Sequence, residues 1–246
     1  MSLPSCLKPI KCSLIRLGSK NDGGYLLSKK TLKEAESLIS FGVLDDCSFE
    51  EHFKEIKKTS IFCFDKIDYK SYWKKRFFND FGAALYNLNY KFIKNTFTKY
   101  FKFKKFFKNR DVFLFEKNIQ ERSLNEIIST YKNIKKPTIL KIDIEGSEYR
   151  LLKDIIKNKN VINGLIIEFH ELDLHLDKVS NFVKELDFKV THVHANNFDR
   201  VIDNIPLVLE MTLEKNPDHE NEFAQLPHKF DAPCNPQKKE INLHFD

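Results

Sequence analysis

Strand-like and helix-like segments alternate along most of this chain, and this alternation is the strongest limit on its fold. Short runs rich in β-branched and aromatic residues recur, and segments with apolar residues at helical spacing separate them. The strand-like runs are SLISFGV, SIFCFD, DVFLFEKN, TILKIDI, GLIIEFHEL, FKVTHVHANN and IPLVLEMTL. This order predicts an α/β fold with a doubly wound, mostly parallel sheet, helices on both faces and a closing pair of strands.

With 246 residues, the chain can form one large α/β domain or two small ones. Its seven Gly and eight Pro are few, and neither a repeat nor a Gly/Ser-rich linker divides it. We therefore expect a single domain over residues 1–246. Three parts are expected to add to the sheet: an N-terminal extension (1–36), a basic aromatic insertion (80–110) and an irregular tail (216–246).

The five cysteines are odd in number and form no CxxC pair. They are expected to be reduced thiols, without a zinc site or a disulfide framework. The first residues lack the apolar run of a signal peptide, and no segment reaches the roughly 18 apolar residues of a membrane span. These features predict a cytoplasmic protein.

The segment YKFIKNTFTKYFKFKKFFKNR (90–110) contains eight Lys or Arg residues, eight aromatic residues and no acid. Two functional interpretations are a nucleic-acid surface and a helix that contacts a membrane surface weakly. The favoured interpretation is structural: an amphipathic helix whose Phe face covers the core while the Lys stems extend to water. Its aromatic residues are spaced to fill a helix face.

The stretch TILKIDIEGSEYRLL places Asp143, Glu145 and Glu148 directly behind an apolar strand. Carboxylates are costly to bury without partners, so water or a ligand has to meet them. Apolar residues at helical spacing come next, and Ser147 is the expected N-cap of that helix. The acids then lie at the carboxyl end of a strand, which is the ligand-binding edge of an open α/β sheet. A solvated loop with acidic caps is the alternative.

The first strand and its turn, SFGVLDDCSFEEHF, have features of a nucleotide site. Gly42 lies where the strand turns toward its helix, and a Gly there lets a ligand approach the backbone. Asp65 follows 23 residues later, where an acid can accept the ribose hydroxyls of an adenosine group. No GxGxxG is present, and Asp45 and Asp46 occupy the turn. These acids argue against NAD or ATP, since they repel a pyrophosphate, and they suit S-adenosylmethionine with its ammonium and sulfonium groups.

Several elements together resemble the FkbM-like, S-adenosylmethionine-dependent methyltransferases, with the greatest similarity to a branch found among bacterial surface-polysaccharide genes. The elements are RLGSKNDGGYLL, FGVLDDCSFE, LKIDIEGSEYRLL, LIIEFHELD, THVHANN and LPHKFDAPCNP. The resemblance implies a class I methyltransferase fold of the Rossmann-like type, and methyl transfer to oxygen, with a sugar hydroxyl as the acceptor. Residues 80–110 match the family pattern least well.

The resemblance also implies a cofactor site. Asp143 is expected at the tip of the fourth strand, beside the methionine part or the transferring methyl, while Glu148 is expected to be structural. KNDGGYLL reads as a hairpin or loop connection, and by resemblance it closes over the cofactor, so that Asp22, Gly23 and Tyr25 contact it. The other predicted cofactor residues are Gly42, Asp46 and Asp65.

Methyl transfer to a hydroxyl needs a positioned acceptor oxygen and usually a base that takes its proton. Strand alternation puts Glu168 and His170 on one face at the carboxyl end of LIIEFHELD. THVHANN similarly places His192 and His194 on one face. Because His titrates near neutrality, we predict His170 as the base, with His194 as the second candidate and Glu168 as the orienting partner.

A metal-dependent mechanism competes with a histidine base. Asp143, Glu168 and a His could hold a divalent cation that lowers the pKa of the hydroxyl. No ligand set of fixed spacing is present, so a metal is not favoured and its ligands stay unknown.

The predicted partner is a sugar or nucleotide-sugar precursor of capsule or lipopolysaccharide. An RNA methyltransferase, or a non-catalytic module that binds membrane or RNA through residues 90–110, is the alternative; nucleic acid is not favoured.

Overall fold

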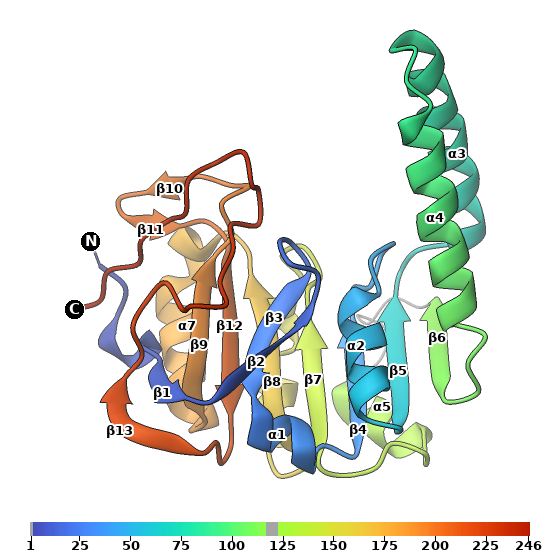
Figure 1. The fold of residues 1–246 in the computed structure, drawn as a ribbon. Helices are drawn as coiled ribbons and strands as arrows, with labels where there is room; N and C mark the ends of the chain where they lie inside the picture. The colour runs from blue at the N-terminus through green and yellow to red at the C-terminus, as the bar shows by residue number, and fades with distance from the viewer. Residues whose placement is uncertain (1, 117–122) are drawn as a thin grey trace.

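The computed structural model describes residues 2–116 and 123–246, and it contains a seven-stranded sheet with helices on both faces (Figure 1). The strand order is β6-β5-β4-β7-β8-β12-β9. The first five strands in this order are parallel, whereas β12 runs antiparallel to both β8 and β9. The strands are β4 (Ser37–Phe41), β5 (Ser60–Asp65), β6 (Val112–Glu116), β7 (Thr138–Ile142), β8 (Ile162–Phe169), β9 (Lys189–Ala195) and β12 (Leu209–Glu214). The predicted doubly wound fold is therefore confirmed; residues 117 and 118 of the third predicted strand lie outside the described residues.

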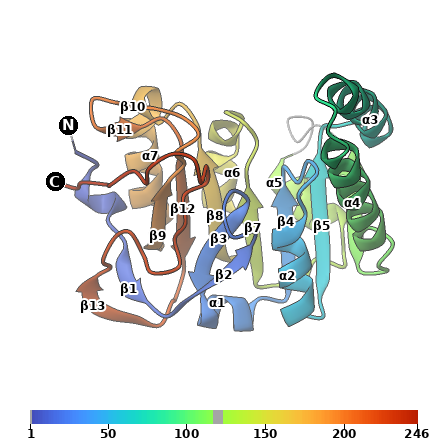
Figure 2. The same cartoon turned by 45° about the horizontal axis from the view of Figure 1, so that its top comes forward.

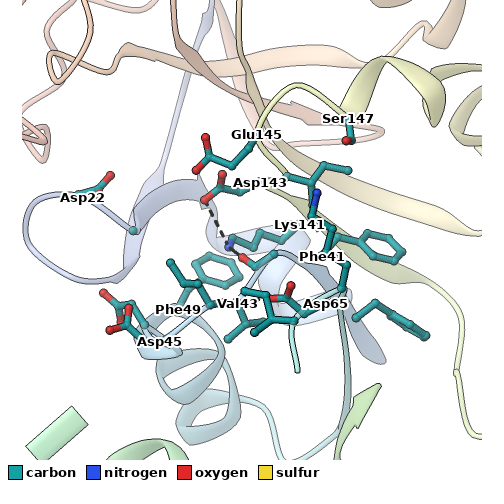
Figure 3. Close-up of a pocket in the computed structure, with 18 of the residues that line it drawn as sticks. Asp22, Phe41, Val43, Asp45, Phe49, Asp65, Lys141, Asp143, Glu145 and Ser147 are labelled. Atoms are coloured by element: carbon teal, nitrogen blue, oxygen red, sulfur yellow. Dashed lines mark hydrogen bonds and ion pairs between the residues drawn. The ribbon is translucent and has the colours of Figure 1, made fainter. Parts of the chain in front are cut away.

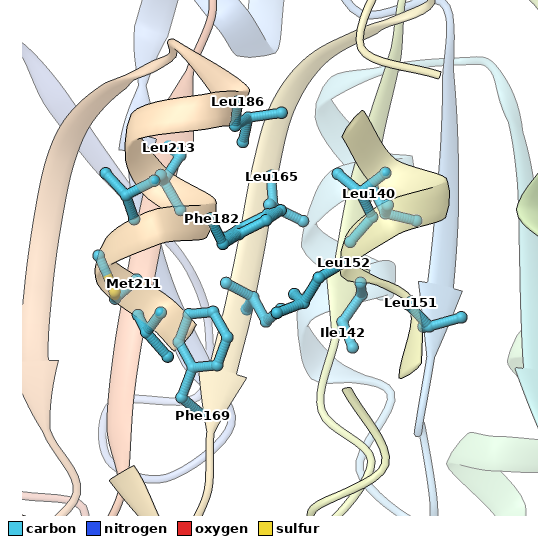
Figure 4. Packing of buried hydrophobic residues seen from close by; sticks show 14 of the residues in the cluster. Leu140, Ile142, Leu151, Leu152, Leu165, Phe169, Phe182, Leu186, Met211 and Leu213 are labelled. Carbon is cyan, nitrogen blue, oxygen red and sulfur yellow. The ribbon is translucent and has the colours of Figure 1, made fainter. Parts of the chain in front are cut away.

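The central strands are buried on both faces. Every residue of β4, β7 and β8 is buried, which explains their nearly continuous apolar runs. One face is covered by α5 (Leu124–Thr130), α6 (Leu152–Lys157) and α7 (Leu172–Leu186), and the other by α2 (Ser48–Ile56). Figure 4 shows Leu140 and Leu165 of the sheet beside Leu152 of α6 and Phe182 of α7.

The direction in which the sheet grows reverses between β4 and β7. The chain continues from β4 to β5 and β6 on one side, and then crosses to β7 and β8 on the other. At such a reversal, the loops beyond the carboxyl ends of the two strands separate and leave a ligand-binding crevice. Gly42 lies there with a φ of 78°, and a Cβ atom on it would lie 1.6 Å from the carbonyl oxygen of Asp143. The two strand ends can meet only because this residue is Gly.

The N-terminal extension and the tail pack against one side of the sheet. β2 (Leu14–Gly18) and β3 (Gly24–Ser28) form an antiparallel hairpin, and α1 (Lys29–Glu34) follows it. β1 (Ile10–Cys12) pairs with β13 (His219–Phe223), so the tail expected to be irregular contains one strand. IPLVLEMTL was expected to be one strand, but it is divided between β11 (Ile205–Pro206), which pairs with β10 (Val201–Ile202), and β12.

α3 (Tyr69–Tyr86) and α4 (Lys91–Phe106) form a helical hairpin that extends beyond the carboxyl ends of β5 and β6 (Figures 1 and 2). The prediction that the Phe face of residues 90–110 covers the core is wrong for most of this segment. Phe103 and Phe106 are buried near the sheet, whereas farther out Phe97 packs on Phe77 of α3 with ring centroids 4.8 Å apart. The hydrophobic spacing predicted a helix correctly, but a second helix, not the sheet, is its main partner.

The crossing after β7 also differs from the prediction. Ser147 has helical φ and ψ values and makes no side-chain cap hydrogen bond, so it is not the N-cap of a helix. A short 3-10 segment (Glu148–Arg150) comes first, and α6 begins only at Leu152.

All five cysteines are free thiols. Among the described residues, no helix is both long enough and apolar enough to cross a membrane.

Candidate active site

A cavity of about 440 Å³ opens at the carboxyl ends of β4, β5 and β7, where the strand order reverses (Figure 3). Pockets for small ligands typically measure about 300–1,000 Å³. Its apolar wall includes Phe41, Phe49 and Phe64, and its polar groups come from the loops that follow the strands. The predicted cofactor residues that line it are Asp22, Gly23, Gly42, Asp46, Asp65 and Asp143.

Asp65 is held in place at the end of β5. Its Oδ2 atom accepts hydrogen bonds from the backbone N–H of Leu44, at 3.1 Å, and from the hydroxyl of Tyr69, at 3.0 Å. Leu44 follows β4 and Tyr69 begins α3, so the carboxylate joins the loops on either side of the cavity. Asp65 therefore lines the cavity at the end of β5, and its role as a ribose acceptor stays a prediction.

The two acids of the first turn have different partners. Asp45 forms ion pairs with Arg76 of α3 and with Lys99 of α4, whose Nζ lies 3.3 Å from the carboxylate. Asp46 accepts a hydrogen bond of 2.9 Å from the backbone N–H of Ser48, the first residue of α2. The base of the helical hairpin thus neutralises one acid of the turn. Lys99 also lines the cavity, so α4 contributes to the site in addition to packing on α3.

Lys141 was missed by the sequence analysis and lies beneath the cavity. Its Nζ donates a hydrogen bond of 2.9 Å to the carbonyl of Gly42 and lies 3.9 Å from Oδ2 of Asp143 (Figure 3). Burial alone would lower the pKa of Lys141, but the charges of Glu50, Asp143 and Glu168 raise it above its usual value. Lys141 is therefore a buried ammonium group that fixes both sides of the switch point.

A second cavity of about 460 Å³ adjoins the first, and Asp22, Asp143 and Glu145 line both. Its other walls come from the carboxyl end of β8 and from the loops after β9 and β11. They consist of Glu168, His170, Asn196, Phe198, Asp199 and Val208. A molecule in each cavity would meet the other beside Asp143.

His170 lies just after β8 and is fixed by the crossing that follows β7. Glu148 accepts a 2.8 Å hydrogen bond from its backbone N–H, and the same Oε1 atom lies 3.3 Å from the ring Nδ1. Tyr149 donates a 2.5 Å hydrogen bond to its carbonyl. The other ring nitrogen, Nε2, lies 3.5 Å from Glu145 and 3.8 Å from Glu168. Glu148 therefore has the structural role that was expected of it.

The carboxylates around His170 change its protonation. Burial lowers its pKa, but the hydrogen bond to Glu148 and the charges of Glu168, Glu148 and Glu145 raise the pKa to about 9. The expectation of titration near neutrality is therefore wrong. At neutral pH the free enzyme holds mostly the imidazolium form.

Tyr25 does not line either cavity, but it connects two residues that do. Its buried hydroxyl lies 3.1 Å from Asp143 and 3.2 Å from Glu168, and Asn196 donates a 3.1 Å hydrogen bond to Glu168. Burial and the charges of Asp143 and Glu210 raise the pKa of Glu168 well above its usual value. A phenol has one proton, so Tyr25 donates to only one of the two carboxylates at a time.

His194 lies outside the residues that line the two cavities. Its Nδ1 is 3.0 Å from Glu210 and its Nε2 is 2.7 Å from Glu240, so both ring nitrogens face carboxylates. His192 similarly lies 2.9 Å from Asp231. The two histidines of β9 thus hold the C-terminal tail. Strand alternation could not reveal this, because their partners in the tail lie far along the chain.

Two groups of side chains bring potential metal ligands close together. The ligand atoms of Asp143, Glu168 and His170 lie within 4.8 Å of one another, as do those of a second group around His194. The first group matches the cation site considered from the sequence and borders both cavities. In the second group, Cys234 donates a hydrogen bond to Glu210, and His194 is hydrogen-bonded to the same carboxylate.

Comparisons with known proteins point to methyl transfer. A family model described as "Methyltransferase FkbM domain" matches residues 89–190, which include β7, β8, Asp143, Glu168 and His170. No curated protein matches the chain.

Among solved structures, a precorrin-6y C5,15-methyltransferase from Geobacter metallireducens is similar over 76% of this chain and 86% of its own, with 13% identity and a TM-score of 0.39. TrmK from M. capricolum, in complex with S-adenosyl-homocysteine, is similar over 82% of this chain and 73% of its own, with 14% identity and a TM-score of 0.38. These likenesses are low, so the fold assignment rests on the strand order itself. The match to the FkbM domain identifies the chain as a methyltransferase.

Proposed function

We propose that this methyltransferase transfers a methyl group to a sugar hydroxyl in a capsule or lipopolysaccharide precursor. S-adenosylmethionine is its cofactor. One observation carries the proposal: two cavities of similar size share Asp22, Asp143 and Glu145. A donor in one and an acceptor in the other can therefore approach in line, which a displacement at a methyl carbon requires.

The first cavity fits the cofactor. Gly42 leaves room for close approach to the backbone, and Asp65 stands where ribose hydroxyls would need an acceptor. Asp22, Asp46 and Asp143 provide negative charge for an ammonium and a sulfonium group. When bound there, S-adenosylmethionine supplies an electrophilic methyl group.

The second cavity fits a small acceptor rich in hydroxyls. Its wall is composed mainly of hydrogen-bond acceptors, together with the amide of Asn196 and the imidazole of His170. The same carboxylates, which include Glu168 and Asp199, would repel a phosphate chain. This charge argues against RNA as the acceptor, and a nucleotide-sugar would have to keep its diphosphate outside this cavity.

His170 is the proposed base. Its Nδ1 faces Glu148, which leaves Nε2 on the side of Glu145 and Glu168. A base has to be neutral to accept the hydroxyl proton, and the positive charge of the bound cofactor would favour loss of the proton from the imidazolium. In this assignment, Glu168 and Tyr25 hold the carboxylate of Asp143 in place beside the acceptor cavity.

The test combines binding and turnover. Calorimetry with S-adenosylmethionine and its demethylated product should give a saturable one-site isotherm. A mass-spectrometric screen with labelled cofactor should then find label in a nucleotide-sugar or a surface glycan and none in ribosomal or transfer RNA. Label in RNA only, with binding that weakens steeply as salt increases, would replace the sugar with RNA as the acceptor.

The metal alternative needs its own measurement. The wild-type rate should be unchanged after treatment with a chelator. If the rate is lost and magnesium or manganese restores it, then the proton-removal role belongs to a cation held by Asp143, Glu168 and His170.

A further inference from the structure

The helical hairpin formed by α3 and α4 ends in a cluster of exposed apolar side chains, which we call the hairpin tip. Each of them exposes more than half of its surface, and Leu88 exposes 93%. Apolar clusters of this kind on a folded protein mark sites of interaction. The hairpin tip consists of Phe78, Phe81, Leu85, Tyr86, Leu88 and Tyr90.

The two helices behind the tip are strongly basic. Together they contain ten Lys or Arg residues and a single acid, Asp80. All nine of their lysines are exposed. The whole chain has a net charge of only +6, so the residues outside the hairpin include more acids than bases. Positive charge is therefore concentrated on the element that also carries the exposed apolar tip.

We propose that the hairpin tip inserts into the headgroup region of an anionic lipid membrane while the lysines of α3 and α4 contact the lipid headgroups. Leu85 and Leu88 provide apolar surface for the acyl boundary, and Tyr86 and Tyr90 have the amphipathic rings that favour the depth of the headgroups. Lysines just behind an inserted segment are attracted by the negative surface potential of the membrane.

The charge pattern separates this partner from two others. Tip-to-tip contact with a second copy would bring two hairpins of like charge together, and repulsion opposes that interface. Single-stranded RNA binds through bases stacked on aromatic faces, which the tip also offers, but it would leave the apolar surface of Leu85 and Leu88 exposed to water. An anionic lipid surface satisfies both the apolar tip and the lysines.

Docking through the hairpin also orients the first cavity relative to the membrane. The hairpin projects from the sheet edge at which the first cavity opens, and Lys99 of α4 lines that cavity (Figure 1). Insertion of the tip therefore turns this edge of the sheet toward the membrane. The docking does not depend on which acceptor is methylated.

Co-sedimentation with vesicles tests the proposal. The full chain should sediment with mixed phosphatidylglycerol and phosphatidylcholine vesicles and not with phosphatidylcholine alone. Because each lysine near an anionic surface is worth roughly a fivefold change in partitioning, a variant with four lysines replaced should bind about a hundredfold or more weakly. The tip variant should lose the sedimentation that persists at high salt, where the attraction of the lysines is screened. The tip variant is L85S/Y86S/L88S, the lysine variant is K91Q/K94Q/K102Q/K105Q, and the matched control at the amino ends of the strands is K58Q/K132Q/K135Q/K136Q.

Thermal unfolding of each variant shows whether the fold is intact, and the tip residues are too exposed for their replacement to disturb it. Equal binding by the tip variant and the wild type would overturn the proposal, as would equal losses in the lysine variant and the matched control. If vesicle binding is absent and light scattering shows a dimer that the tip variant breaks, then the tip binds a second copy. Salt-sensitive binding to an RNA oligonucleotide that survives in the tip variant would assign the lysines to RNA instead.

Discussion

The Nε2 atom of His170 lies 3.8 Å from Oε1 of Glu168, at the boundary between the proposed acceptor cavity and the carboxyl end of β8. Both groups have a raised pKa, His170 to about 9 and Glu168 well above its usual value. The pair therefore holds protons more tightly than either group would in water. This property determines how the rate should depend on pH.

The first prediction concerns His170 as the base. The wild-type rate should rise with pH, because only the neutral imidazole can accept a proton, and the midpoint should lie below the free-enzyme pKa of about 9, since the cofactor's positive charge favours loss of that proton. His170→Ala should lower turnover by about 10²- to 10⁴-fold and remove this limb of the profile, while cofactor affinity changes little. Steady-state kinetics at several pH values provide the measurement.

Glu148→Gln provides the matched control, since it removes a charge that raises the pKa of His170. The midpoint should move to lower pH in this variant, and the rate at neutral pH should rise, because a larger fraction of His170 is then neutral. An unshifted midpoint would show that another group is responsible for the limb.

The second prediction concerns Asp65 as a cofactor ligand. Asp65→Ala should weaken S-adenosylmethionine binding by about ten- to a hundredfold, because a lost charge-assisted hydrogen bond is worth roughly 1.5–3 kcal/mol. Tyr69→Phe removes the phenol that donates to the same carboxylate and keeps its charge, so it should change the affinity far less. Unchanged affinity in calorimetry of Asp65→Ala would remove this residue from the site.

The third prediction concerns the buried ammonium of Lys141. Lys141→Met should destabilise the protein by roughly 1–3 kcal/mol, because it leaves the carbonyl of Gly42 without its donor and removes a charge that offsets the burial of Glu50. The double variant Glu50→Gln/Lys141→Met should regain part of this loss. Urea unfolding of both variants measures the coupling, and additive losses would show that the two charges act independently.

The fourth prediction separates His194 from catalysis. Its ring joins Glu210 of β12 to Glu240 of the tail, so His194→Ala should release residues 224–246 and lower the melting temperature. Limited proteolysis should cut the tail of this variant sooner than that of the wild type. If His194→Ala instead remains fully folded and loses turnover while His170→Ala stays near-normal, then His194 is the base.

The sequence revealed the sheet because its central strands are buried on both faces and read as continuous β-branched or aromatic runs. Gly42 and Asp143 could be placed at strand ends by the turns that follow them. The direction of α4 could not be predicted, since the same hydrophobic spacing serves a helix that packs on a sheet and one that packs on another helix.

Buried charges were the second feature that could not be predicted from the sequence. Lys141 lies between apolar residues in a strand, and nothing local distinguishes it from a solvated lysine; its counter-charge, Glu50, is 91 positions away. The raised pKa of His170 has the same origin, since Glu145 and Glu148 reach it from a different crossing. The partners of His192 and His194 in the tail were hidden for this reason too.

The place of β12 between β8 and β9 has a consequence for synthesis. β9 leaves the ribosome before β12, yet it lies outside β12 in the finished sheet. The nascent chain therefore exposes the hydrogen-bonding edge of β8 until residues 209–214 emerge, and β9 cannot reach its final place earlier.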